Sequence, residues 1–414
     1  QVLPPTEVFL SVPYAAPPVG AARFSPTNSP LPWDGVRTCV AAPPACPQPS
    51  IWPPRQGASA PNARRAAFLA AVSPLLANQS EDCLYLNIYA PQNDESSSMA
   101  VIVWVHGESF SWGAGSIYDA SVLASYARVV VVTLNYRLGP LGFLNTSPGG
   151  RDDDNGIHGV VGNQGLLDIL AALSWVRENI QGFHGNPHSV TLLGHTTGAA
   201  LVNYLLVSPV VVPDMFHRAI LMSGSAHSPW AEVRDALSVT ARLAHQLNCP
   251  LPNDLNTRHP ETMACLRNVS ASELVKIELP EYKFNSVWGP SIDGVVVQQD
   301  FNTRPVSVSG QEPVSVLFGV TDADATVHLS QLHDTRGVNV QERDQIFRTY
   351  VRNNYHHHLQ EIFLAIIKDY SDWGNPSHHP IKVRDLVVEA LCDAEYVAPM
   401  AKFGQLLAER NNKA

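Results

Sequence analysis

Short apolar runs alternate with longer segments of helical periodicity along this chain. Val101–Val105, Val129–Thr133 and Val190–Leu193 each have the length and composition of a buried strand. Between the last two, after Asn163, apolar residues recur about every 3.6 positions, which predicts an amphipathic helix. These residues are Leu166, Leu170, Leu173, Val176 and Ile180. Strands that alternate with helices predict a mostly parallel central sheet with helices on both faces.

The same alternation continues towards both ends of the chain. Further strands are expected at Val8–Val12, Arg218–Ser225 and Val314–Val320. Further helices are expected at residues 199–207, 341–373 and 381–411, with the helix-breaking Trp373–Ser377 between the last two. No internal repeat or low-complexity tract is present in the sequence. We therefore expect a single α/β domain over residues 1–414.

A glycine-flanked turn organises the middle of the chain. The strand at Val190–Leu193 runs into Gly194-x-Thr196-x-Gly198, and an apolar helical run follows. Strand, tight turn and helix is the arrangement of the nucleophile elbow, G-x-S-x-G, in the α/β-hydrolase fold. Glycines are needed because neighbouring backbones approach closely at such a turn. The central residue is Thr196 instead of serine, so the sequence predicts a hydrolase scaffold with an altered attacking group.

Composition restricts the functional classes. The chain has 414 residues, 45% of them hydrophobic and 15% charged, which favours a large buried core over disorder. The formal net charge is −10 with no basic run, which argues against nucleic acid as a partner. No apolar run reaches the roughly 18 residues that a membrane span requires. The chain opens on Gln1 instead of methionine, so we expect a processed or partial chain.

Cysteines and glycosylation sequons favour an oxidising compartment. The sequence contains six cysteines and 33 prolines. Asn78 and Asn268 begin sequons, and Asn145 begins a third that Pro148 weakens. Sequons also arise by chance in chains of this length. Together these features favour a secreted or cell-surface protein, with glycans expected at Asn78 and Asn268.

Several motifs resemble type-B carboxylesterases and cholinesterases. They are Ala15–Gly20 followed by Arg23-Phe24, and the run Ser80–Tyr89, which contains S-E-D-C-L. The resemblance implies an α/β-hydrolase fold whose C-terminal part lies beyond this chain. It also implies two disulfides, Cys46–Cys83 and Cys249–Cys265, and leaves Cys39 and Cys392 without family partners.

The same resemblance assigns the positions of an esterase site. Thr196 stands at the nucleophile, where a β-branched residue is unfavourable because the elbow is strained. His106-Gly107-Glu108 replaces the glycine-rich oxyanion loop, and a carboxylate about 4 Å from an oxyanion would cost roughly 1–4 kcal/mol. Asp324 stands at the acid, and the family's catalytic histidine would lie past the end of this chain. We therefore expect no catalytic residues, only degenerate positions at Thr196, Asp324, Gly107 and Glu108.

Histidine runs are a separate candidate chemistry. His356–His358 and His378-His379 have a metal-ligand composition, but consecutive side chains cannot all face one site. Exposed surface is the favoured interpretation, so no metal site is predicted within the chain.

Within this superfamily the chain resembles neuroligins, in particular their invertebrate branch. The motifs that carry this are Trp104–Phe110, Tyr118–Tyr126, Asn135–Gly139, Gly194–Gly198 and Phe216–Ser225. Vertebrate neuroligins keep a glycine where Glu108 stands. The resemblance implies a catalytically inactive adhesion ectodomain on the extracellular side of the postsynaptic membrane. A transmembrane helix and cytoplasmic tail would lie outside this chain.

The resemblance also implies partners. Neuroligins bind neurexins through calcium, and the loop at the old acid position, Asp322, Ala323, Asp324 and Thr326, corresponds to part of the neurexin-facing surface. No cofactor is implied apart from calcium at that interface. Dimerisation in the family uses a helix that corresponds to residues 359–373. Its apolar stripe of Leu359, Phe363, Ile366, Ile367 and Tyr370 fits a dimer contact and ordinary core equally well.

Two other functions remain open on the sequence. The first is a carboxylesterase that uses Thr196 as nucleophile with a base from beyond residue 414. The second is another inactive adhesion relative, of the gliotactin, glutactin or neurotactin type, with a different partner.

Overall fold

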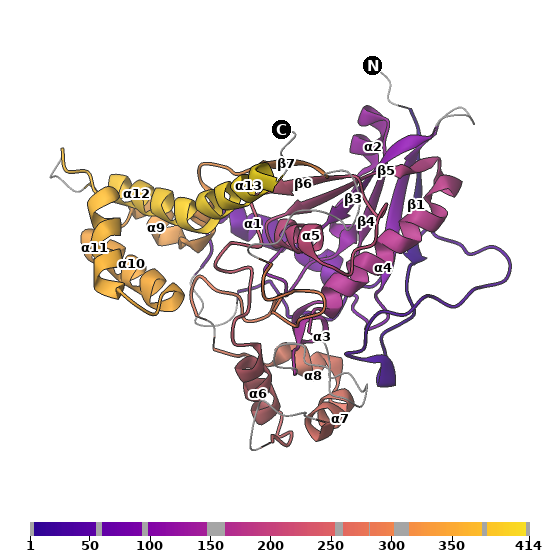
Figure 1. Ribbon diagram of the computed structural model, residues 1–414, viewed down its shortest axis with the longest axis horizontal. Helices are drawn as coiled ribbons and strands as arrows, with labels where there is room; N and C mark the ends of the chain where they lie inside the picture. The colour runs from indigo at the N-terminus through magenta and orange to yellow at the C-terminus, as the bar shows by residue number, and fades with distance from the viewer. Residues whose placement is uncertain are drawn as a thin grey trace.

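The computed structural model has a seven-stranded sheet at its centre, with helices packed around it (Figure 1). The structure describes residues 4–54, 60–92, 98–146, 162–252, 260–280, 282–301, 314–374 and 379–410. The strands are β1 Thr6–Pro13, β2 Tyr85–Pro91, β3 Met99–Val105, β4 Val130–Leu134, β5 Gly185–His195, β6 Arg218–Met222 and β7 Ser315–Gly319. Their spatial order is β1-β2-β4-β3-β5-β6-β7. This is the mostly parallel α/β-hydrolase sheet that the alternating pattern predicts.

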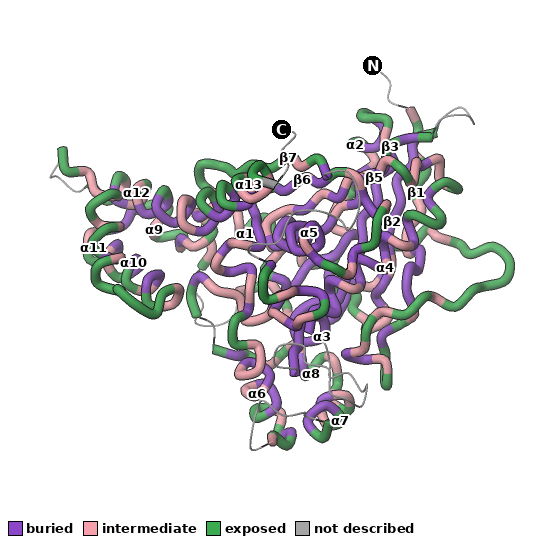
Figure 2. The backbone as a smooth tube through the Cα atoms, in the orientation of Figure 1, coloured by how far each residue is buried: buried purple, intermediate pink, exposed green. Residues whose placement is uncertain are grey.

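Parallel pairing follows from the helical crossovers. β4, β3, β5, β6 and β7 are parallel neighbours, whereas β1 and β2 pair antiparallel at one edge. The crossovers are α2 Ser121–Ala127, α4 Gln164–Asn179 and α5 Thr197–Val207. Every residue of β4 is buried, which requires cover on both faces of the sheet. Figure 2 shows this buried band running through the sheet and α5.

The other helices form two outlying groups in Figure 1. One group, at the bottom of the view, contains α6 Ala236–Gln246, α7 Pro260–Asn268 and α8 Ala271–Lys276. The other, at the left, contains α9 Gln331–Arg336, α10 Val340–Asn354, α11 Leu359–Asp369 and α12 Pro380–Cys392, and α13 Ala398–Arg410 leads back over the sheet. The remaining short helices are α1 Ala63–Val72 and α3 Gly139–Phe143.

Three differences from the predicted elements are informative. The segment 341–373 is two helices, α10 and α11, because the chain turns at Tyr355–His358, where His358 has φ +56°. The segment 381–411 is likewise interrupted, by a π-helical turn at Asp393–Val397. β2 was not predicted from periodicity, because polar Asn87 lies among its apolar residues. It directly follows the S-E-D-C-L motif.

Both disulfides expected from the resemblance are present. Cys46 is bonded to Cys83 and Cys249 to Cys265, while Cys39 and Cys392 carry free thiols. The second bond holds α7 against the end of α6. None of the helices in the described ranges is long and apolar enough to cross a membrane.

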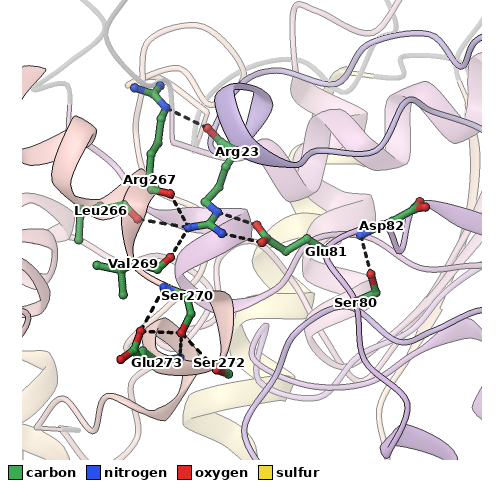
Figure 3. Close-up of polar contacts among 10 residues, drawn as sticks. All are labelled: Arg23, Ser80, Glu81, Asp82, Leu266, Arg267, Val269, Ser270, Ser272 and Glu273. Atoms are coloured by element: carbon green, nitrogen blue, oxygen red, sulfur yellow. Dashed lines mark hydrogen bonds and ion pairs between the residues drawn. The ribbon is translucent and has the colours of Figure 1, made fainter.

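The residues that carry the esterase resemblance hold loops together (Figure 3). Arg23 forms a bidentate ion pair with Glu81, with Nε and Nη2 each 2.6 Å from a carboxylate oxygen. Its Nη1 donates to the carbonyl of Arg267, in the last turn of α7, at 2.9 Å, and to that of Val269, just after the helix. One guanidinium therefore ties the N-terminal segment to the S-E-D-C-L loop and to the C-terminal end of α7, where helix carbonyls favour a cation.

Candidate functional site

The elbow between β5 and α5 has the strained geometry that its glycines predict. Thr196 lies at φ +48° and ψ −115°, and its N–H donates to the Met222 carbonyl at 2.8 Å. A Cβ added at Gly198 would collide with the Val105 carbonyl, and one added at Gly224 would collide with the carbonyl of Thr196 itself. Only glycine fits at these flanking positions, so the β5–α5 turn is built as a nucleophile elbow with threonine at its tip.

The Thr196 hydroxyl lies against the altered oxyanion loop. A Cβ added at Gly107 would collide with Thr196 Oγ1 and with the His195 carbonyl. No side chain in the described part of the chain forms a hydrogen bond with this hydroxyl. A threonine hydroxyl is a weak nucleophile without a base to take its proton. The described residues thus place a hydroxyl at the elbow without placing a base beside it.

The Glu108 carboxylate forms an ion pair with Arg65 of α1. The Oε2–Nη2 distance is 2.5 Å and the Oε1–Nη1 distance is 3.4 Å. Arg65 also lies 5.4 Å from the Trp112 ring centroid and 5.3 Å from that of Phe68. The charge is compensated, so the expected penalty of an isolated carboxylate at the oxyanion position does not apply in full.

The loop that carries Glu108 is itself strained. Glu108, Ser109 and Phe110 all have positive φ, at 109°, 52° and 57°. Positive φ is uncommon for residues other than glycine and persists only where the surroundings enforce it. The Arg65 ion pair and the buried Phe110 ring supply that enforcement.

Two histidines, His106 and His195, lie near the elbow, and burial lowers the pKa of both, which favours the neutral form. His106 is fully buried, its ring stacks on Tyr136 at 4.4 Å, and burial lowers its pKa to about 4. Burial also lowers the pKa of His195, while Glu108 and Asp324 act in the opposite direction. His195 therefore lies within electrostatic reach of both the oxyanion-loop position and the acid position.

The loop after β7 brings the four predicted partner-binding residues onto one turn. Asp324 begins a short 3-10 helix, Asp324–His328, and accepts hydrogen bonds from Thr321 N at 2.9 Å and Thr321 Oγ1 at 2.8 Å. Asp322 and Ala323 are exposed, and the half-buried Thr326 donates to the Ala323 carbonyl at 2.8 Å. Only Asp322 presents a fully exposed carboxylate, because Asp324 is half-buried and bonded within the loop.

Sequence reasoning missed a hydrogen-bonded pair behind this loop, His328 with the buried Glu395. Glu395, fully buried on the π-helical turn, lies 2.8 Å from His328 Nε2, and Phe284 packs edge-on against the His328 ring at 5.0 Å. Cys392, also buried, accepts a hydrogen bond from Ala325 N at 3.2 Å. The only signal in the sequence is a glutamate beside the apolar Tyr396 and Val397, which by itself is unremarkable in a helix.

The apolar stripe on α11 belongs mainly to the core. Phe363 is buried, and Ile366, Ile367 and Tyr370 pack partly buried against the main hydrophobic cluster. Leu359 is 39% exposed. The ordinary-core interpretation therefore holds for four of the five stripe residues, and the exposed apolar side chains nearby are Leu359, Leu364 and Trp373.

The remaining candidate positions lie at the surface or inside the fold. Asn78 and Asn268 are exposed, as glycan acceptors must be, whereas Asn145 is buried and donates to Ser291 Oγ at 2.8 Å. His356–His358 are exposed. Ser147 and His378 lie outside the described residues. Within the described ranges, no three His, Cys, Asp or Glu side chains gather as a metal site.

Comparison with known proteins decides the family. Residues 2–414 match the family described as "Carboxylesterase family". The chain belongs to the carboxylesterase family. Among curated members it is 35% identical to neuroligin-1 of Caenorhabditis elegans and 33% identical to neuroligin-2 of Mus musculus, over 96% and 99% of this chain. It is also 33% identical to carboxylesterase 5A of Mus musculus over 96% of this chain.

This member of the carboxylesterase family spans only part of those relatives. It covers 51% of the nematode neuroligin-1, 49% of the mouse neuroligin-2 and 64% of the mouse carboxylesterase 5A. The relatives thus include both neuroligins and a protein named as an esterase. Family membership therefore assigns the scaffold, and the choice between adhesion and hydrolysis depends on the residues at the elbow.

Proposed function

We propose that this chain is a non-catalytic carboxylesterase domain that acts as an adhesion module at the cell surface. The observation that carries the proposal is the elbow, where Thr196 replaces the serine at a strained position with φ +48°. Glu108, which is paired with Arg65, also supports the proposal, because in the oxyanion loop its side chain stands where esterases of this family have a glycine. Each change alters a component that acyl transfer requires, because threonine adds a methyl group beside the hydroxyl and Glu108 adds a carboxylate to the oxyanion loop.

The proposed partner is a neurexin-like surface protein, bound with the help of calcium at the loop after β7. Similarity to neuroligins supports this, and so does the exposed Asp322 on that loop. Calcium takes about six to eight oxygen ligands. In this loop Asp322 offers a free carboxylate, while both Asp324 oxygens accept bonds from Thr321, so the partner would have to supply most of the ligands. Asp324 and Thr326 then shape the loop, and Ala323 leaves room for contact.

The proposed location is the extracellular side of the plasma membrane, at the postsynaptic membrane by analogy with neuroligins. Two disulfides and two exposed sequons support an oxidising compartment. A homodimer is proposed through the exposed part of the α11 region, Leu359, Leu364 and Trp373, because these apolar side chains are 39%, 53% and 72% exposed.

A carboxylesterase is the second candidate. The match to carboxylesterase 5A and the intact elbow geometry of Thr196 favour it. In that case a base from outside this chain would have to reach Thr196 Oγ1, and the Gly107 N–H would have to stabilise the oxyanion beside Glu108.

Two assays on the secreted protein separate these functions. The first measures hydrolysis of p-nitrophenyl acetate by the unaltered chain and by the Thr196→Ala and Thr196→Ser variants. We expect no turnover above background in any of them, because serine alone restores neither base nor oxyanion loop. Turnover that disappears with Thr196→Ala would establish the esterase.

The second assay measures binding to an immobilised neurexin ectodomain by surface plasmon resonance, in calcium and in chelator. Asp322→Ala is the test variant, and Asp34→Ala, which removes another exposed aspartate, is the matched control. We expect binding in calcium that is lost in chelator and weakened by Asp322→Ala alone. Equal binding by both variants would remove this loop from the interface, and no binding at all would favour another partner.

A further inference from the structure

A cavity lies between α6 and α10, outside the elbow. Its volume is about 740 Å³, within the range of roughly 300–1,000 Å³ that is typical of small-molecule sites. The start of α6, residues 280, 282, 283 and 285–287, and the C-terminal turn of α10 contribute to its lining. The two helices come from the outlying groups that Figure 1 shows at the bottom and at the left.

One part of the cavity wall is apolar. Val233 and Val239 are buried at 8% and 5% exposure, and Val287 is half-buried beside them. Burying a ligand's apolar surface against such a wall contributes about 25 cal/mol per Å². The wall therefore favours a ligand with an apolar body over a fully hydrated ion.

The rest of the wall is cationic, against the charge of the chain as a whole. Four basic side chains line the cavity, namely Arg234, Arg242, Lys283 and Arg352. Among the described residues, the acidic ones in the lining are Glu232 and Asp235, and Asp235 already caps α6 by accepting a hydrogen bond from Ser238 N. The lining thus carries an excess of positive charge within a chain of net charge −10.

The cations are available to a ligand. Arg234, Lys283 and Arg352 are exposed, and none of the three takes part in an ion pair within the described residues. Arg242 makes only a 3.3 Å bond to the Ser238 carbonyl. Guanidinium groups bind carboxylate, sulfate and phosphate through paired hydrogen bonds, and they do so more strongly beside apolar surface.

We propose that this cavity binds a small organic anion that has an apolar body and a carboxylate or sulfonate-type head. The apolar body lies against Val233, Val239 and Val287, and the head lies at the mouth between Arg234 and Arg352. The site is independent of the elbow and of the loop after β7, and the proposed adhesion function does not require it.

The experiment is a fluorescence titration of the folded chain with 8-anilinonaphthalene-1-sulfonate, checked for stoichiometry by equilibrium dialysis. The test variant is Arg234→Gln with Arg352→Gln. The control is Arg348→Gln, which removes another cation of α10 whose guanidinium lies 4.0 Å from the Phe363 ring, outside the cavity lining. We expect one saturable site per chain, at least tenfold weaker binding by the double variant, and a change below twofold in the control.

A second measurement needs no variant. Dodecanoate should displace the probe at concentrations at least tenfold lower than dodecanol, because only the acid presents a charged head. The neutral analogue N-phenyl-1-naphthylamine should likewise bind at least tenfold more weakly than the sulfonate. Equal displacement by acid and alcohol, or equal binding of the double variant and the control, would overturn the proposal.

Discussion

The buried ion pair between Arg137 and Asp168 should dominate the response of this fold to a single substitution. Asp168 lies within α4, and its carboxylate accepts four hydrogen bonds. Three come from Arg137, from N at 2.9 Å, Nε at 2.8 Å and Nη2 at 2.8 Å, and the fourth comes from Thr27 Oγ1 at 2.5 Å. The side chains are 3% and 0% exposed. Asp168→Asn keeps the shape, removes the charge and turns an NH₂ group towards donors.

The magnitude follows from burial. Breaking a buried ion pair by removing one partner costs about 3–5 kcal/mol, because the other charge remains unpaired away from water. With an unfolding entropy of about 2.1 cal/mol/K per residue, a chain of 414 residues has roughly 0.9 kcal/mol/K. The expected decrease in Tm is therefore about 3–6 °C. This assumes that the whole chain unfolds as one cooperative unit.

The assay is paired urea and thermal unfolding, followed by circular dichroism, with Asp385→Asn as the matched control. Asp385 also forms an ion pair with an arginine, Arg384, at 2.7 Å, but its side chain is 53% exposed. The control should cost less than about 0.5 kcal/mol. Replacing both buried partners, Arg137→Met with Asp168→Leu, should recover part of the loss. If Asp168→Asn and Asp385→Asn shift Tm equally, burial does not set the energetics of this pair.

Three further predictions follow from other parts of the fold. Burial lowers the pKa of His106 to about 4 from 6.5, so the stability that this group contributes is present above pH 6.5 and lost towards pH 4. Urea melts should show a loss of up to roughly 3 kcal/mol over that window, reduced in His106→Asn. Cys249→Ser opens the loop closed by Cys265, 16 residues away, and should cost about 3 kcal/mol in chemical unfolding. Leu317 is 67% exposed on β7, and within the described residues this strand has a neighbour on one side only. An exposed apolar edge strand favours pairing with another chain, so Leu317→Lys should reduce the self-association measured by light scattering.

The order of elements was predictable because it depends on local patterns. Uninterrupted apolar runs identified β3 and β4, the 3.6-residue repeat identified α4, and the glycines of Gly194–Gly198 identified the elbow. Each of these signals lies within a stretch of neighbouring residues. The breaks at His358 and at Asp393–Val397 were not predictable in this way, because both flanks of each break have helical periodicity.

The chemistry of the site depended on contacts that are distant in sequence. The sequence places a glutamate at position 108, but the partner of its carboxylate is Arg65, 43 residues away on α1. The same holds for His328 and Glu395, 67 residues apart. Asp324 is different, because its carboxylate accepts hydrogen bonds from Thr321, three residues earlier in the same loop. Residue types and their order along the chain determined the scaffold and the altered elbow. The direction and protonation of each charged side chain were decided only by packing, because the energy of a charge depends on its burial and on its neighbours in space.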